Sequence, residues 1–380
     1  MRARVARRHG FAAVAIAMVA LLTAACGSNG AGTDASTPAK TTTSGGSTVA
    51  SAYLKPPTTL PVSTPVTKPI PSGLKLIFIQ GGFPQSQTIF KGLQAAAGVL
   101  GWSVSSMNYD STNPATIPSA IQSAIAQKPA AIILNGPLVA QYASVIPQAI
   151  AAGVPLIPAA TSDTAQNGVY PVINSDLDNS QVAKLLTDSL VADAQKAGVT
   201  AHVLQLTVPV VKVVLGPEDD GVASELKAKC PQCTRDLLNL NLPDVYSGKY
   251  TQQVVSYLQS HPDINYIVSD SGQLGDGLPQ ALQQAGLSKV VDYGVSATNV
   301  QIQQLKSGAP GAWTVQPYQV WGWIIADQVA RLKIGDPTNL WENDKLGYVV
   351  TSANAEDVDP NDQEFPVGYE DMFKKMWKKQ

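Results

Sequence analysis

Two cysteines and two histidines carry the most reactive side chains in the body of the chain. Cys230 and Cys233 stand in Cys-Pro-Gln-Cys, which in a cytosolic protein indicates a redox pair or half of a zinc site. Zinc needs two further soft or imidazole ligands, and His202 and His261 stand at no metal-like spacing. A redox pair normally opens a helix, whereas this pair follows a predicted helix at 221–229 and precedes a strand. The pattern favours a local disulfide in an oxidising compartment and no metal site.

The sequence contains no arrangement typical of an enzyme. It has no Gly-x-Ser-x-Gly elbow, no phosphate-binding loop and no cluster of zinc ligands. His202 belongs to a predicted strand and His261 precedes a proline, so little is available for acid–base catalysis. We therefore expect a binding protein without a cofactor.

The third cysteine, Cys26, ends an export signal. Four arginines precede an apolar run from Phe11 to Leu22, which is shorter than the roughly 20 residues that span a bilayer. The sequence Leu22-Thr23-Ala24-Ala25-Cys26 resembles the lipobox of bacterial lipoproteins, although Thr23 stands where leucine is usual. This predicts a lipoprotein signal peptide at 1–25 and a lipid anchor on Cys26 outside the cytoplasm. An ordinary cleaved signal with an incidental cysteine is the alternative.

Residues 26–72 are rich in Ser, Thr, Gly and Pro and carry few charges. Such a composition buries no core, so it predicts a flexible linker with an extended proline-rich end.

The remaining residues are numerous enough for two lobes. Hydrophobic residues make up 44% of the chain and charged residues only 14%. Four of the 26 Lys and Arg residues lie in the signal, against 28 Asp and Glu, so the body is mildly acidic. This balance argues against nucleic acid as a partner.

Short apolar runs alternate with longer amphipathic ones from residue 74 onward. Predicted strands are 74–80, 103–108, 130–134, 155–158, 170–173, 202–207, 236–240, 266–269, 290–293 and 313–315. Predicted helices are 86–101, 115–127, 140–152, 178–197, 221–229, 250–260, 275–285, 299–307 and 320–332. Strands that are apolar on both faces favour parallel sheets covered by helices on both sides. The sequence therefore predicts an α/β fold with two doubly wound parallel-sheet lobes.

The order and spacing of several short stretches resemble type I periplasmic binding proteins, in the branch of the ribose and galactose receptors of ABC importers. These stretches are 127–134, 151–157, Ser269-Asp270 with Leu274-Gly275, Gln316-Pro317, and 349–354. The resemblance covers residue 73 to the end and implies a three-segment hinge, near 174–175, 316 and 346–347. It implies an N-terminal lobe of 73–174 and 317–345, and a C-terminal lobe of 175–316 and 346–380.

Ligands of open parallel sheets bind beyond the carboxyl ends of the strands, so we expect the site there. The resemblance implies that Phe83, after the first strand, stacks on a sugar ring; alternatively it plugs the edge of its own lobe. Gln85 and Ser86 head the next helix and either contact the ligand or cap that helix.

Three polar residues follow the third and fourth strands. Asn135 faces the ligand or serves the Asn-Gly-Pro turn. Thr161 and Ser162 stand where sugar receptors of this family commonly carry an Asp-Arg pair. Asp163, one residue further, is not expected to substitute for that pair.

The C-terminal lobe departs from the family pattern in the same way. Glu218 stands near the position of the family's arginine, Ser296 near that of a later aspartate, and Ser269 at that of an asparagine. Asp270 remains as a ligand contact or a helix cap, and Gln316 remains at the crossover.

Aromatic residues follow that crossover. Tyr318 is expected near the ligand, while Trp321 and Trp323 are expected in the core.

Loss of the arginine and two carboxylates removes strong directional contacts to hydroxyl groups, which points to a less polar ligand than a free hexose. The resemblance implies a monomeric, lipid-anchored receptor that delivers a small solute to an ABC importer permease. The alternative is a sensor that presents the same clamp to a membrane signalling receptor.

Overall fold

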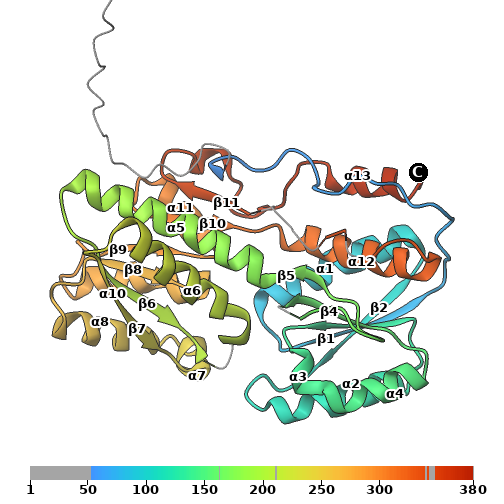
Figure 1. Ribbon diagram of the computed structural model, residues 1–380. Coiled ribbons are helices and arrows are strands. Elements are labelled where there is room, and N and C mark those ends of the chain that lie inside the picture. Colours follow the sequence, from blue (N-terminus) through green and yellow to red (C-terminus); the bar gives the residue numbers. More distant parts are fainter. Residues whose placement is uncertain (1–52, 162, 210–211, 339, 342–346, 380) are drawn as a thin grey trace, which may run out of the picture. The chain divides into compact units, whose positions relative to one another are not determined.

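The computed structural model describes residues 53–161, 163–209, 212–338, 340–341 and 347–379 (Figure 1). Side chains at 174–179 and 211–220 are outside this description. All described residues belong to one compact unit.

The first sheet has five parallel strands in the order β2-β1-β3-β4-β5. They are β1 (Lys75–Gln80), β2 (Ser103–Asn108), β3 (Ala131–Asn135), β4 (Leu156–Thr161) and β5 (Val172–Asn174). Strands β3 and β4 are buried throughout, because helices cover both faces of the sheet.

Helices α1 (Pro84–Leu100) and α12 (Tyr318–Ile334) share one apolar cluster with Leu76 and Phe78 of β1. The other face of β1, with Ile77 and Ile79, packs in the cluster that contains residues of α2 (Ile117–Ile125).

The helix expected at 140–152 is interrupted. It forms α3 (Val139–Tyr142), the 3₁₀ turn η3 (Ala143–Val145) and α4 (Ile146–Ala151). Pro147 is the reason, since its ring fits only the first turn of a helix, where the structure places it. A further 3₁₀ turn, η2 (Pro114–Thr116), leads into α2.

The second sheet has six strands in the order β11-β10-β9-β8-β6-β7. They are β6 (His202–Thr207), β7 (Thr234–Asn239), β8 (Tyr266–Ser269), β9 (Val291–Gly294), β10 (Ala312–Val315) and β11 (Tyr348–Thr351). All pair in parallel except β11, which runs antiparallel to β10.

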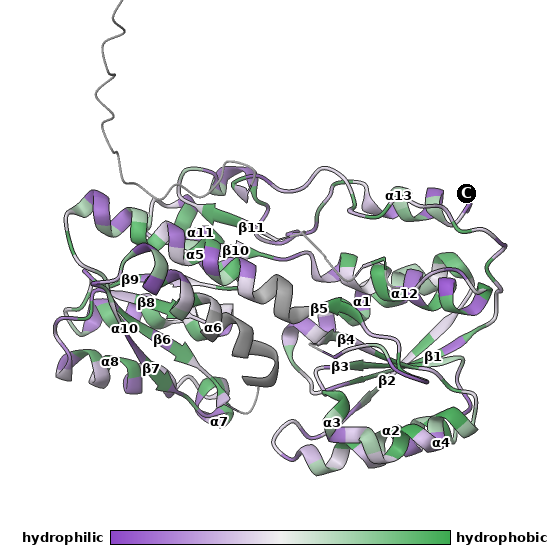
Figure 2. Cartoon of the chain, viewed as in Figure 1, coloured by the Kyte–Doolittle hydropathy of each residue, from purple (hydrophilic) through white to green (hydrophobic). Residues whose placement is uncertain are grey.

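Helices again cover both faces of this sheet. Residues of α5 (Ser175–Ala197) and α6 (Lys212–Lys229) pack with Val203 and Val268 on one face. Residues of α8 (Tyr250–Ser260) and α10 (Leu278–Gln284) pack with the other face. Figure 2 shows hydrophobic colours at buried strands such as β6 and β11, whereas the edge strand β7 is mixed.

The shorter elements around this sheet are α7 (Leu242–Tyr246), α9 (Gly272–Gly275), α11 (Asn299–Lys306) and η5 (Ala355–Asp357). The single helix expected at 275–285 is split into α9 and α10. Gly277 lies between them with φ of 75°, a left-handed conformation that a helix cannot continue through.

The architecture confirms the predicted α/β class with two mostly parallel sheets. The chain passes from β5 into α5 at residues 174–175 and from β10 into α12 at Gln316 and Pro317, and it returns after α12 to β11. The first two places agree with the expected crossovers. The third, expected near 346–347, lies at residues 342–346, which are outside the described residues, and the lobe boundaries drawn through these places remain a proposal.

Residues 53–72, which we name the N-terminal strap, correct the prediction of a flexible linker. Leu60, Val62, Val66 and Ile70 are buried in the core cluster of α1 and α12. An extended segment can pack against the protein when apolar side chains recur every two to four positions. The many threonine and proline residues between them make the average composition look like that of a flexible linker. Residues 26–52, including Cys26, lie outside the described residues.

The C-terminal helix α13 (Tyr369–Met376) also corrects a predicted boundary. Trp377 stacks on Trp323 of α12, with ring centroids 5.4 Å apart, and Phe373 lies in the same cluster. Residues 369–377 therefore pack on α12, a helix of the expected N-terminal lobe, although they were assigned to the C-terminal lobe. The predicted core positions of Trp321 and Trp323 are confirmed.

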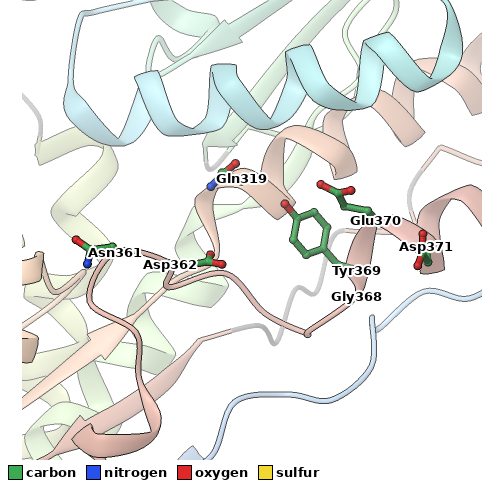
Figure 3. A pocket seen from close by; sticks show the side chains of 7 residues that line it. All are labelled: Gln319, Asn361, Asp362, Gly368, Tyr369, Glu370 and Asp371. Carbon is green, nitrogen blue, oxygen red and sulfur yellow. The ribbon is translucent and has the colours of Figure 1, made fainter.

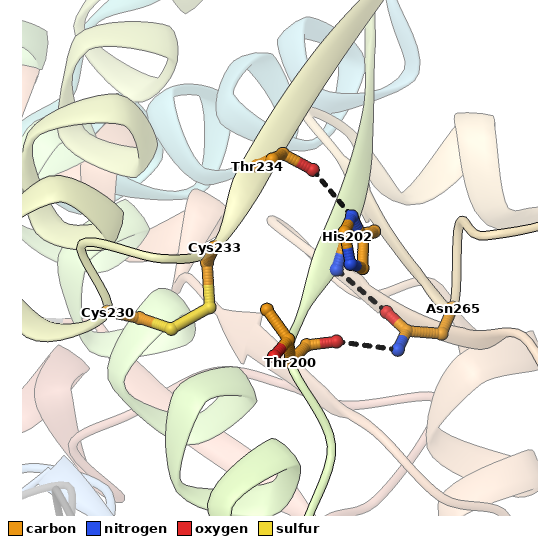
Figure 4. Close-up of a disulfide and its surroundings, with 6 residues drawn as sticks. All are labelled: Thr200, His202, Cys230, Cys233, Thr234 and Asn265. Carbon is orange, nitrogen blue, oxygen red and sulfur yellow. Dashed lines mark hydrogen bonds between the residues drawn. A yellow bond between two sulfur atoms is a disulfide. The ribbon is translucent and has the colours of Figure 1, made fainter. Parts of the chain in front are cut away.

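Cys230 and Cys233 form a disulfide, in agreement with the prediction (Figure 4). Their Cα atoms are 5.3 Å apart, and the bridge closes the turn between α6 and β7. His202 lies nearby but contacts Thr234 through Nδ1 at 2.8 Å rather than a sulfur atom. The disulfide thus crosslinks a local turn.

Candidate ligand-binding site

Polar side chains gather where the strands of the first sheet end. Ser86, in the first turn of α1, donates a hydrogen bond from Oγ to Oδ1 of Asn135 at 2.5 Å. Asn135 is the last residue of β3 and donates from Nδ2 to the carbonyl of Ala159 at 3.3 Å. Ser86 and Asn135 are both buried, so two predicted site residues meet here. Gln85, beside them in α1, is half-buried.

The segment after β4 is organised by Asp163. Both carboxylate oxygens of Asp163 accept from the backbone N–H of Val139 at 3.1 Å, and Oδ2 accepts from Thr161 Oγ1 at 3.1 Å. Burial raises the pKa of Asp163, while these donors act in the opposite direction. Asp163 therefore links Thr161 to the start of α3. Ser162 lies outside the described residues.

Two aromatic rings lie at the same edge of the first sheet. Phe83 is half-buried and packs against the apolar cluster of β6, α8 and α10, which belongs to the second sheet. Tyr109 follows β2, and its hydroxyl would lie 2.8 Å from a Cβ added at Gly81 or at Gly136. Because Gly81 and Gly136 have no Cβ atom, the Tyr109 hydroxyl fits beside both of them.

Sequence reasoning missed Tyr109. Burial raises the pKa of Tyr109 to about 12, and Tyr246 of α7 contributes to the shift. The signal was available, because Tyr109 directly follows a strand that was correctly bounded at 103–108.

The second sheet brings three predicted residues into one hydrogen-bonded group. Ser296 Oγ and the Tyr318 hydroxyl donate to Gln316 Oε1 at 2.8 and 2.6 Å, and the two hydroxyls are 2.7 Å apart. Gln316 is 4% exposed. Ser296 adopts φ of 61°, and its backbone N–H donates to Thr314 Oγ1 at 3.1 Å. The group lies where the chain crosses from β10 to α12.

Asp270 belongs to a chain of hydrogen-bonded side chains. Its Oδ1 accepts from Gln205 Nε2 at 2.6 Å, and Gln205 Oε1 accepts from Arg235 Nη1 at 2.6 Å. Asp270 is 1% exposed and Gln205 is fully buried. The Arg235 contact fixes the orientation of the Gln205 amide, so that its NH₂ group faces the carboxylate. Gln205 was missed, although a glutamine inside the apolar strand 202–207 requires polar partners.

Ser269 does not join these groups. Its hydroxyl donates to Asp292 Oδ1 of the neighbouring strand β9 at 3.1 Å, and burial raises the pKa of Asp292. Glu218 lies in α6, and its side chain is outside the described residues.

A separate surface pocket is lined by Gln319, Asn361, Asp362, Gly368, Tyr369, Glu370 and Asp371 (Figure 3). None of the predicted site residues lines it. Beside it, the half-buried Glu364 accepts from the backbone N–H of Gln319 and Val320 at 3.0–3.1 Å and so caps the start of α12. Burial raises the pKa of Glu364 from 4.5 to about 7, against the effect of these donors.

This shift predicts a pH dependence of stability. The folded protein holds the Glu364 proton more tightly than the unfolded chain, so the contribution of Glu364 to stability is fully present below pH 4.5 and is lost as the pH rises to about 7. Glu364→Gln is expected to remove this contribution. The urea midpoint of this variant should therefore change less with pH between pH 5 and 8 than that of the wild type. Glu370→Gln, at an exposed position, is the control. Identical slopes for wild type and Glu364→Gln would contradict the prediction.

The described residues contain no group of three or more His, Cys, Asp or Glu side chains that could hold a metal ion. No helix in the described part of the chain has the length and apolarity needed to cross a membrane.

Solved structures with this fold include transporter-associated binding proteins. An ABC sugar transporter subunit from Rhodobacter sphaeroides 2.4.1 is 22% identical, with a TM-score of 0.62, and the match covers 74% of this chain and 98% of that one. A 5-methylthioribose transporter solute-binding protein from Thermotoga lettingae TMO is 17% identical, with a TM-score of 0.65 and coverage of 80% and 100%. An ABC transporter solute-binding protein from Agrobacterium vitis with bound allitol is 19% identical, with a TM-score of 0.64 and coverage of 75% and 98%.

Among curated proteins, none matches the chain. The family described as "Periplasmic binding protein domain" matches residues 77–337, which is more than half of the sequence. Its members are substrate-binding proteins rather than enzymes, and they act outside the cytoplasm. This chain therefore belongs to the periplasmic binding protein family.

Proposed function

We propose that this protein is a lipid-anchored solute receptor that captures a small sugar, polyol or less polar relative and delivers it to an ABC importer. The observation that carries the proposal is the group of Ser296, Gln316 and Tyr318. It joins the loop after β9 to the first residue of α12 across the crossover between the two sheets. A ligand bound there engages groups from both sides of that crossover, as hinge closure requires.

The chemistry of the described site residues supports a neutral ligand with hydroxyl groups. Ser86, Asn135, Gln316 and Tyr318 are neutral donors and acceptors, while Asp270 supplies a carboxylate for strong hydrogen bonds to hydroxyl groups. Phe83 and Tyr109 supply aromatic surface for the apolar face of a ring. The bound ligands of structural relatives, such as allitol, fall in the same chemical range.

The proposal of a lipid anchor is based on the sequence, and the proposal of delivery to an importer is based on the family. The segment around Cys26 supports attachment to the outer face of the cell membrane. We propose that ligand-driven closure presents a surface recognised by the permease.

A thermal-shift screen tests ligand capture. Allitol, D-arabinose, D-tagatose, 5-methylthioribose and nucleosides are the probes. A compound at 100 times its Kd is expected to add about 2.7 kcal/mol to the free energy of unfolding. Gln316→Leu is expected to weaken the affinity of that compound at least about tenfold, because it removes an acceptor shared by two hydroxyls.

Gln122→Leu, at an exposed position of α2, is the matched control and should leave the affinity unchanged. If no member of the panel shifts the melting temperature, capture of sugars and their relatives is refuted. If a ligand binds but its uptake survives deletion of the gene, delivery to an importer is refuted.

A further inference from the structure

The N-terminal strap, residues 53–72, contacts both sheets on its way to β1 (Figure 1). Its later residues pack with α12, α13 and α1, whereas its first residues pack with the helices and strands of the second sheet. Three passages of the chain connect the two sheets, and a further one leads from β11 to α13, which packs on α12. The strap adds another connection, and this one depends on non-covalent contacts.

Residues 60–71 of the strap are firmly attached to the side of the first sheet. Four of their side chains are buried, those of Leu60, Val62, Val66 and Ile70. Hydrogen bonds fix the backbone at several points. The N–H of Val66 donates to the carbonyl of Met376 at 3.0 Å, and Trp102 Nε1 donates to the carbonyl of Pro71 at 2.7 Å.

Two charged side chains complete this attachment. Arg331 Nη2 donates to the carbonyl of Thr64 at 2.6 Å. The backbone N–H of Thr67 donates to Asp336 Oδ2 at 2.8 Å, and the Thr67 hydroxyl contacts Asp336 Oδ1. Releasing residues 60–71 would uncover buried apolar surface and break these bonds together.

Tyr53 and Leu54, which we name the clasp, hold the other end of the strap by fewer contacts. Both are half-buried against the cluster of α5 and the second sheet. The Tyr53 hydroxyl accepts from Gln181 Nε2 of α5 at 2.6 Å, and the carbonyl of Leu54 accepts from Asn354 Nδ2 at 2.8 Å. Asn354 also donates to the carbonyl of Val349, so the clasp is fixed to the end of β11.

Only residues 55–59 lie between the clasp and Leu60, and two of them are Pro56 and Pro57. A fully extended chain spans at most about 3.6 Å per residue, and prolines further restrict the conformations of this segment. The distance between the two anchors therefore has an upper limit.

From this geometry we propose that the strap braces the hinge, limiting how far the two sheets can separate, and that the clasp is the end that releases in wide opening. The proposal goes beyond ligand capture. It rests only on the hinge motion of the proposed function. Because the clasp makes fewer contacts than residues 60–71, the clasp detaches first when the anchors are pulled apart. The strap thereby biases the ligand-free protein toward states in which the sheets are close.

The test is a distance measurement on the full chain without ligand. Spin labels are attached to Cys introduced by Gln122→Cys on α2 and Gln283→Cys on α10, both exposed, in a chain that carries Cys26→Ser. The remaining cysteines are held in the Cys230–Cys233 disulfide. The double variant Tyr53→Ala, Leu54→Ala is expected to broaden the distribution of label distances and extend it to longer values.

Lys55→Ala with Thr58→Ala, two exposed positions of the connecting segment, is the matched control and should leave the distribution unchanged. A distribution unaltered by the clasp variant would overturn the proposal. So would a fall in melting temperature of more than about 4 °C, since a releasable contact cannot carry that much of the stability. Gln181→Ala, which removes one hydrogen bond from the clasp, should give a smaller broadening in the same direction. Because no ligand is used, a failed ligand screen leaves this result interpretable.

Discussion

Asp327→Ala is expected to lower the free energy of unfolding by about 3–5 kcal/mol. Asp327 lies in the middle of α12 and is 0% exposed. Its carboxylate accepts from Arg331 Nε, Trp341 Nε1 and Trp377 Nε1, each at 2.7 Å. Removing the carboxylate leaves a buried guanidinium without the carboxylate it pairs with on α12, and two buried indole N–H groups without an acceptor.

The loss should extend beyond α12, because the three donors come from different parts of the chain. Trp377 follows α13, Trp341 follows α12, and Arg331 also donates to Thr64 of the N-terminal strap. We therefore expect Asp327→Ala to loosen α13 and the strap together. Urea unfolding measures the free energy, and amide exchange of residues 60–71 and 369–377 measures the loosening.

Asp371→Ala is the matched control. Asp371 also pairs with a basic residue on its own helix, Lys374 at 3.0 Å, but it is exposed. Exposed pairs contribute about 1 kcal/mol or less, so the control should be nearly neutral. Equal losses for the two variants would show that the buried carboxylate has no special role.

Gly92→Ala is expected to cost about 1–3 kcal/mol of stability. Gly92 of α1 lies against the first turn of α12, and a Cβ at this position would overlap the carbonyl group of Gln319. Gly322 of α12 is equally close to the backbone of Ile89 and Leu93. Two backbones that approach through glycines cannot accept a methyl group unless the helices move apart.

Gly98→Ala, on the same helix, separates this packing effect from helix propensity. Gly98 is exposed, and a Cβ there would meet no atom within 4 Å. Alanine should therefore stabilise α1 by about 0.5–1 kcal/mol at position 98. The prediction for Gly92 fails if both alanine variants raise the urea midpoint.

The sequence located the buried strands well, because runs that are apolar on both faces can form little else. Among them, β6 and β8 have the predicted bounds to the residue. The bounds of β2 were also predicted to the residue, although β2 is a largely exposed, serine-rich edge strand. Helices were less accurate where a single residue changes the backbone, as with Pro147 inside 140–152 and Gly277 inside 275–285. Hydrophobic periodicity continues through such breaks, so periodicity alone does not reveal them.

The N-terminal strap was missed for a different reason. Its composition resembles a disordered segment, and only contact with surfaces built later in the chain shows that its few apolar residues are buried. Composition describes a segment alone, whereas docking depends on a partner that is distant in sequence.

The candidate site was predictable where position and residue type agreed. Ser296, Gln316 and Tyr318 were chosen because each follows a strand or a crossover, and the structure brings them together. Ser269 occupies an equivalent position, yet its hydroxyl faces Asp292, since the direction of a side chain at a strand end depends on its neighbours. Gln205 was not predicted, because the sequence does not show the hydrogen-bond partners of a buried amide. Tyr109 was not predicted, because the sequence does not show that its hydroxyl lies beside Gly81 and Gly136.

The outer strands of the sheets have a consequence for aggregation. In the first sheet, β2 lies at an edge and carries Ser103, Ser105 and Ser106, and in the second sheet the edge strand β7 carries Arg235 and Asp236. An edge strand offers unpaired backbone groups to any other extended chain, and polar or charged side chains make such an addition unfavourable. At β2 and at β7, the addition of a strand from a second molecule is therefore unfavourable, which limits edge-to-edge association through these two strands when many copies are crowded together.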